Sequence, residues 1–129
     1  MNTTSIGNTG ENLAVDFLKK KKYSIVDRNY RAGHGEIDII AKSDKTLVFV
    51  EVKTRNGRSI QKFGSGKFAV DAKKKSAFIS AVNTYLYQHA QNGPCRIDVI
   101  EITLSDPPEI KHYENAFGYQ STPYSYRKY

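Results

Sequence analysis

Two neighbouring apolar runs constrain the fold of this 129-residue chain more than any other feature. The first contains Ile37, Ile39 and Ile40, and the second runs from Leu47 to Lys53 with valine at every second position. β-Branched residues favour strands, and the short polar segment 43–46 between the two runs favours a turn. The pattern therefore predicts an antiparallel β-hairpin.

The rest of the chain predicts elements on both sides of this hairpin. Apolar residues at helical spacing predict one helix over 8–22 and a second that begins after Asp71 and ends before Gly93. Further strands are predicted over 23–30, 96–104 and 110–113. This order of helix, three strands, helix and two strands indicates an α/β fold with a mixed sheet.

The expected domain organisation is simple. One domain is predicted over residues 1–117, which is an ordinary domain size. Residues 118–129, rich in tyrosine and serine, are predicted to be a loose tail. The segment 55–67 contains three glycines and few apolar residues, so it is predicted to be a loop.

Composition narrows the functional classes. The formal net charge of +7 favours a polyanionic partner such as nucleic acid. No apolar run approaches the roughly 20 residues that span a bilayer, and the N-terminus lacks a secretory signal, so we expect a cytoplasmic protein without membrane contact. A single cysteine, Cys95, excludes an internal disulfide and a Cys-rich zinc site.

Acidic residues interrupt both strands of the predicted hairpin. Alternation along the first strand places Asp38 on one face with Glu36 and Ile40, opposite Ile37. Along the second strand it places Glu51 on one face with Phe49 and Lys53. Carboxylates about 5 Å apart repel by about 3 kcal/mol per pair at an effective dielectric constant of about 20. A Mg²⁺ ion would remove this repulsion and activate a water molecule. Lys53 would then orient that water or stabilise the charge of the transition state.

A structural interpretation of the same acids stays open. Glu51 and the lysine that follows it would form an unremarkable ion pair on a solvated strand face. Glu11 is equally compatible with metal binding and with capping of the first helix together with Asn8. Glu36 is predicted to balance a neighbouring arginine, either Arg28 or Arg31.

Together these motifs resemble a known family. Gly10-Glu11, Gly35 to Ile40 (GEIDII) and Phe49 to Arg55 (FVEVKTR) resemble the YraN-like family of small bacterial proteins over about residues 7–117. Further matching segments are Val70 with Lys74, Cys95–Val99 and Glu114–Phe117. That family is similar to the PD-(D/E)xK nuclease superfamily, with its restriction-endonuclease-like core, and in layout to archaeal Holliday-junction resolvases.

The resemblance implies a catalytic set of Glu11, Asp38, Glu51 and Lys53. It implies a Mg²⁺ or Mn²⁺ site held by Asp38 and Glu51, with Glu11 as a further ligand or an anchor through water, and Lys53 on the nucleophile. Ile37 replaces the proline that usually precedes the aspartate, a departure that does not touch the chemistry. Because junction resolvases act as symmetric dimers, the resemblance also implies a homodimer, although no dimer surface is legible in the sequence.

Basic residues are concentrated just after the predicted catalytic lysine. Backbone phosphates of nucleic acid require such an array of cations. No element has the pattern of a recognition helix, so we expect recognition by shape rather than by base sequence. The resemblance to nucleases favours DNA over RNA. The predicted nucleic-acid contacts are Arg55, Arg58, Lys62, Lys67, Lys73 and Lys74.

The leading hypothesis is a metal-dependent endonuclease that hydrolyses phosphodiester bonds in DNA, with branched DNA as a candidate substrate. Two alternatives stay open. One is a nucleic-acid-binding module that retains a nuclease fold without catalysis. The other is a basic protein-interaction domain with an acidic partner. Cleavage assays, metal-dependent melting and the salt dependence of binding distinguish the three.

Overall fold

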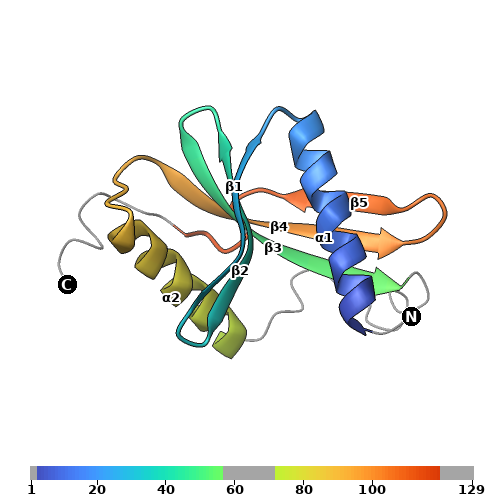
Figure 1. The fold of residues 1–129 in the computed structure, drawn as a ribbon, viewed down its shortest axis with the longest axis horizontal. Helices are drawn as coiled ribbons and strands as arrows, with labels where there is room; N and C mark the ends of the chain where they lie inside the picture. The colour runs from blue at the N-terminus through green and yellow to red at the C-terminus, as the bar shows by residue number, and fades with distance from the viewer. Residues whose placement is uncertain (1–2, 57–71, 120–129) are drawn as a thin grey trace.

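The computed structural model describes residues 3–56 and 72–119, with side chains from residue 9 onward. The elements follow the predicted order, as Figure 1 shows. Their bounds are α1 (Thr3–Lys20), β1 (Ser24–Ala32), β2 (Gly35–Ser43), β3 (Thr46–Asn56), α2 (Ala72–Gln88), β4 (Cys95–Leu104) and β5 (Glu109–Tyr113). Asp71 and most of the predicted loop and tail lie outside the described residues.

The strands form one mixed sheet in the order β1-β2-β3-β4-β5. β3 and β4 pair in parallel, while all other neighbouring strands are antiparallel. The connection between the parallel strands contains α2, because a parallel pair requires a long crossover. The predicted α/β fold is confirmed, and a mixed sheet flanked by two helices is consistent with a restriction-endonuclease-like arrangement. Neither helix in the described part of the chain is both long and apolar enough to cross a membrane.

Each helix covers a different face of the sheet (Figure 1). Phe78 and Leu86 of α2 pack in one cluster with Phe49 of β3. Leu18 of α1 packs in the other cluster with Val50. The predicted alternation along β3 is therefore confirmed, because its buried neighbours point in turn to α2 and to α1.

The predicted face of Ile37 is wrong. Alternation places Ile37 opposite Ile40, but both side chains belong to the α2 cluster. Before Ile39, β2 pairs with β1 and no longer with β3, and a two-stranded ribbon twists more strongly than a broad sheet. β1 is also irregular there, because Asn29 has a left-handed φ of 54°. These two features reorient Ile37.

The first helix begins five residues earlier than predicted, at Thr3 instead of Asn8. The unpaired amides of a helix belong to its first four residues. Glu11 lies in the third turn, so capping by Asn8 and Glu11 is the wrong interpretation. Glu11 must have another role.

Asp98, on β4, is fully buried and forms a polar network. Its carboxylate accepts a hydrogen bond of 3.0 Å from Arg96 Nε and one of 2.9 Å from the Asn115 amide. His112 Nε2 lies 2.7 Å from the other oxygen, and Arg96 also donates to the Tyr23 hydroxyl at 2.7 Å. Burial opposes ionisation, but the hydrogen bonds from His112 and Arg96 outweigh it and lower the pKa of Asp98. The network joins β4, β5 and the segment that follows α1.

Replacing Asp98 should therefore destabilise the fold. We expect Asp98→Asn to lower the free energy of unfolding by about 3 kcal/mol at pH 7, because Arg96 would lose its buried partner. Urea denaturation measures this, with the exposed Asp16→Asn of α1 as the matched control. Since the pKa is lowered on folding, the difference between wild type and variant should shrink as the pH falls below about 4. Equal stability of both variants at pH 7 would contradict this account.

Candidate active site

The candidate site lies where β2 and β3 diverge. Ile39 with Val50 is the last pair in their register, and Asp38 and Glu51 are the next residue on each strand. The Val52 amide donates a hydrogen bond of 2.7 Å to Asp38 Oδ2. The Asp38 carboxylate thus takes the position of a strand carbonyl, and this contact fixes its orientation.

The two acids affect each other's ionisation. Burial and then the charge of Glu51 raise the pKa of Asp38 to about 8, with smaller contributions from Glu11 and Glu36. Burial also raises the pKa of Glu51, against the opposing charges of Lys53 and Lys74 and a hydrogen bond to Asp38. A hydrogen bond between two carboxyl groups requires a proton, so the pair holds one near neutral pH in the absence of a cation.

The pair opens into a cleft of about 180 Å³. One wall is the β1–β2 turn, which contributes His34, and the other is α2, which contributes Lys74 and Ala77. A Cβ added at Gly35 would overlap the carbonyl oxygen of Ala77, so only glycine allows this close approach of strand and helix. Lys74 lies one turn before Ala77 and is therefore held over the same cleft.

Lys53 and Lys74 flank Glu51 from different elements. Lys53 does not line the cleft, yet its charge has the largest effect among those that lower the pKa of Glu51. The charges of both lysines thus act on Glu51. His34 also lines the cleft, and no sequence signal connects it to the acids.

Glu11 is the predicted site residue that the structure does not bring into the pair. It lies near the site because Gly10 permits α1 to contact Thr54 of β3, where any Cβ would overlap the threonine side chain. Its carboxylate instead pairs with Arg28 Nη2 at 3.5 Å. In residues 3–56 and 72–119, no group of three His, Cys, Asp or Glu side chains is placed to hold a metal ion. The predicted third ligand is thus separated from the other two.

The remaining charged residues around the site have varied roles. Glu36 lines the cleft and pairs with Arg31 Nε at 3.3 Å, which confirms its predicted charge balance. Lys73 and Lys74 are exposed at the start of α2. Arg58, Lys62 and Lys67 lie outside the described residues.

Arg55 differs from its predicted role as a nucleic-acid contact. Its side chain is 10% exposed and pairs at 3.7 Å with Glu101, which is 2% exposed. Because Glu101 is a buried acid, it requires a cation nearby. Arg55 thus neutralises a buried acid, so it is not one of the proposed contacts to nucleic acid.

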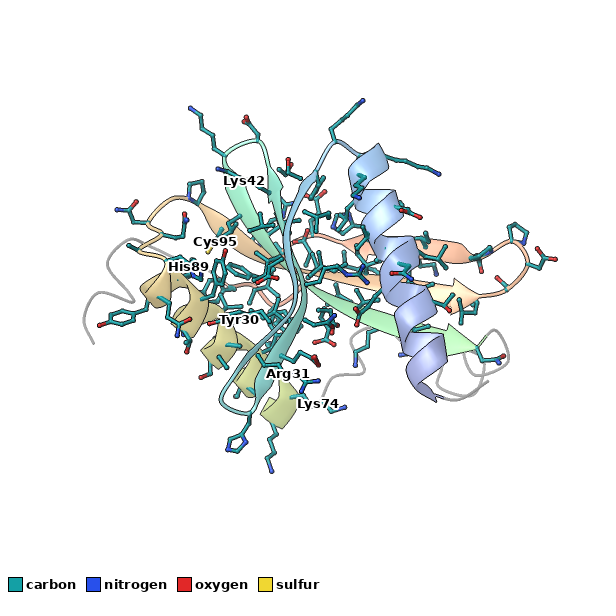
Figure 2. The ribbon with its side chains drawn as sticks, in the orientation of Figure 1. Tyr30, Arg31, Lys42, Lys74, His89 and Cys95 are labelled. Atoms are coloured by element: carbon teal, nitrogen blue, oxygen red, sulfur yellow. The ribbon has the colours of Figure 1, made fainter. Side chains whose placement is uncertain are left out.

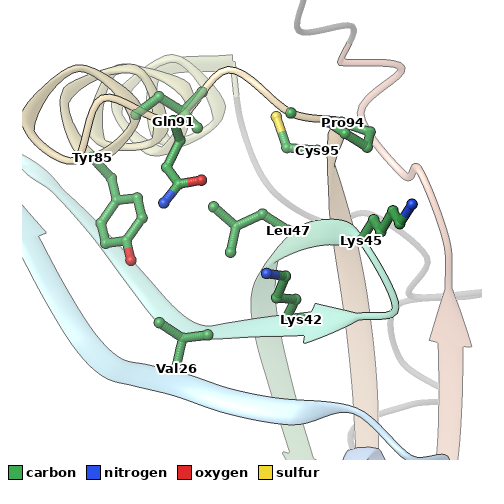
Figure 3. A pocket seen from close by; sticks show the side chains of 10 residues that line it. Val26, Lys42, Lys45, Leu47, Tyr85, Gln91, Pro94 and Cys95 are labelled. Atoms are coloured by element: carbon green, nitrogen blue, oxygen red, sulfur yellow. The ribbon is translucent and has the colours of Figure 1, made fainter.

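A second cavity lies at the far end of β2. Figure 2 shows Lys74 and Arg31 near one end of this strand, and Lys42 and Cys95 near the other. The second cavity measures about 200 Å³, and Figure 3 shows Leu47 between Lys42 and Tyr85. None of the described residues that line it is acidic, so these residues offer no carboxylate to a divalent cation.

The chemistry of the acidic pair fits a Mg²⁺ or Mn²⁺ ion. Mg²⁺ binds through one or two carboxylates and completes its shell with water and substrate phosphates. Asp38 and Glu51 supply two such carboxylates, and burial is the largest cause of their raised pKa values. A bound divalent cation would stabilise their charged forms.

Fold and site define a class of small α/β protein with an acidic pair at the divergence of two central strands. The chain belongs to the uncharacterised protein family UPF0102, which it matches over residues 10–102. This segment contains the acidic pair, both glycine contacts and the start of α2.

Relatives in several bacteria share most of their length with the chain. The UPF0102 protein of Geobacter metallireducens is 43% identical over 119 residues, covering 91% of this chain and 95% of the relative. That of Nitrosomonas europaea is 38% identical and covers 88% and 97%. That of Thermotoga neapolitana is 43% identical and covers 81% and 90%.

The raised pKa of Asp38 predicts a stabilising substitution. Asp38→Asn keeps the acceptor for the Val52 amide but removes one charge, so we expect a gain of more than about 1 kcal/mol at pH 8. The folded wild type holds an extra proton between about pH 4 and pH 8, so its stability falls as the pH rises through this range. The gain should therefore be small at pH 5.

Thermal melting in a metal chelator at both pH values measures this effect, with Asp16→Asn as the control. A loss of stability at pH 8 would indicate that Asp38 is instead stabilised by an ion pair.

Proposed function

We propose that this protein is a metal-dependent nuclease that hydrolyses phosphodiester bonds in DNA. The observation that carries the proposal is the half-buried pair of Asp38 and Glu51, held together in a cleft beside two lysines. Ionisable groups whose pKa values are shifted by burial and by a like charge are concentrated at functional sites. A pair that costs folding stability needs such a reason to persist.

The structural alternative has less support. An ion pair of Glu51 with Lys53 on a solvated face would lower the pKa of Glu51. Glu51 is half-buried, and its pKa is raised despite the charge of Lys53. Burial, with a smaller contribution from the charge of Glu36, thus outweighs the effect of the lysine on the pKa of Glu51.

The roles of the residues follow from their positions. A bound divalent cation supplies a Lewis acid and lowers the pKa of a coordinated water. Asp38 and Glu51 would hold this ion, and the Val52 amide keeps Asp38 in the required orientation. Lys53 would orient the attacking water and stabilise the negative charge that develops on the phosphorus oxygens. Lys73 and Lys74 would contact flanking phosphates.

The proposal also places the chain with the YraN-like proteins in the PD-(D/E)xK superfamily. Asp38 and the Glu51-x-Lys53 motif occupy adjoining strands, which supports this assignment. The resemblance to junction resolvases makes branched DNA the proposed substrate class and a homodimer the proposed assembly. Such a nuclease would act in the cytoplasm.

Cleavage assays test the activity. We expect the full chain with Mn²⁺ or Mg²⁺ to cleave at least one of a four-way junction, a flap and a linear duplex. Asp38→Asn, Glu51→Gln and Lys53→Ala should each reduce the rate by about 100-fold or more. Lys20→Ala, an exposed change on α1, is the charge control for Lys53→Ala. Failure to cleave any of these substrates, or full activity of Glu51→Gln, would refute the nuclease.

The salt dependence of binding tests the partner. In Ca²⁺, affinity for junction DNA should fall by about 0.9 log units per phosphate contact for each tenfold rise in salt. The double variant Lys73→Gln/Lys74→Gln should reduce this slope by about 2. A steep slope without cleavage would indicate a binding module that has lost catalysis. A flat response would instead favour an acidic protein partner.

A further inference from the structure

Arg28 joins the edge strand β1 to the helix that carries Glu11. Its Nη2 atom donates a hydrogen bond of 2.9 Å to Asn12 Oδ1 and lies 3.5 Å from Glu11 Oε1. Its backbone amide donates to Asp27 Oδ1 at 2.8 Å. The guanidinium therefore contacts two successive residues of α1 from a strand whose own backbone is held locally.

A β-bulge determines where Arg28 points. Ile25 pairs with Ala41, but the register then shifts, so that Arg28 pairs with Ile39. Without the shift, Arg28 would stand opposite Asp38. Directly opposite residues of antiparallel strands point to the same face, and Ile39 belongs to the α1 cluster. The bulge thus directs Arg28 away from Asp38 and toward Glu11, as bulges near functional sites often do.

Glu11 is close to the acidic pair but is not part of it. Its charge contributes to the raised pKa of Asp38, so its carboxylate acts on the pair across a short distance. Among the residues that the structure describes, however, no third acid completes a metal-binding group with Asp38 and Glu51. The contact with Arg28 accounts for this separation, because the guanidinium lies 3.5 Å from Glu11 Oε1 and attracts this carboxylate toward β1.

We propose that Arg28 is a positioning residue that holds Glu11 outside the coordination sphere of the metal. Asp38 and Glu51 then remain the carboxylate ligands, and coordination positions stay open for water and a substrate phosphate. This inference rests on the proposed nuclease function. Arg28 suits the task because its guanidinium is always charged and its Nη2 atom contacts Asn12 and Glu11 together.

Mn²⁺ titration calorimetry on the full chain tests the inference without relying on activity. We expect Arg28→Gln to tighten Mn²⁺ binding by about threefold or more, because released Glu11 becomes a third ligand. Glu11→Gln alone should change the Kd by less than about twofold. The double variant should bind Mn²⁺ as Glu11→Gln does, because the effect of Arg28 acts through Glu11. Lys20→Gln, which removes one positive charge at an exposed position of α1, should leave the Kd within about twofold.

The outcomes separate the possible explanations. If Arg28→Gln tightens binding equally in the Glu11→Gln background, Arg28 merely repels the ion and the inference is overturned. Weaker or unchanged binding by Arg28→Gln also overturns it. If the wild type does not bind Mn²⁺ at all, the proposed function fails, and this inference fails with it. Should Arg28→Gln not fold, Arg28→Lys replaces it, and we expect a smaller shift of the Kd in the same direction.

Discussion

The organisation of the molecule around its site depends on one costly contact, the close approach of the Asp38 and Glu51 carboxyl groups. Ordinarily like charges in a partly buried position separate or find a cation. Here the backbone keeps the two residues together, because each is next to the last β2–β3 pair on its own strand. The Val52 amide also donates a hydrogen bond to the Asp38 carboxylate. The strand register thus causes the repulsion between the two carboxylates, and a bound cation would relieve it.

Two glycines allow the two helices to pack close to this pair. Gly10 lets α1 contact Thr54, and Gly35 lets α2 contact Ala77. Each contact sets the position of a charged residue nearby, Glu11 on α1 and Lys74 on α2. A methyl group at either glycine would move a helix away from the site, so these positions control site geometry without any chemistry of their own.

Arg28 shows how the same fold directs one arginine away from Asp38. An uninterrupted β1–β2 register would put a guanidinium opposite Asp38 and neutralise it. One extra residue in β1 instead moves that charge to the face of α1, where it engages Glu11. The separation of Glu11 from the pair and the direction of Arg28 away from Asp38 thus have the same structural origin.

Local pattern was enough to determine the element order, the mixed sheet and the pairing of Asp38 with Glu51. Strand alternation and hairpin register depend on residues that are close together in the sequence. The positions of Glu11, Arg55 and His34 depended on tertiary structure. Glu11 was diverted by an arginine from an edge strand, Arg55 by an acid on β4, and His34 entered the cleft through the Gly35 contact. Each outcome depends on which distant charge or backbone lies within a few ångströms, and a bulge or a missing Cβ decides that only in the assembled fold.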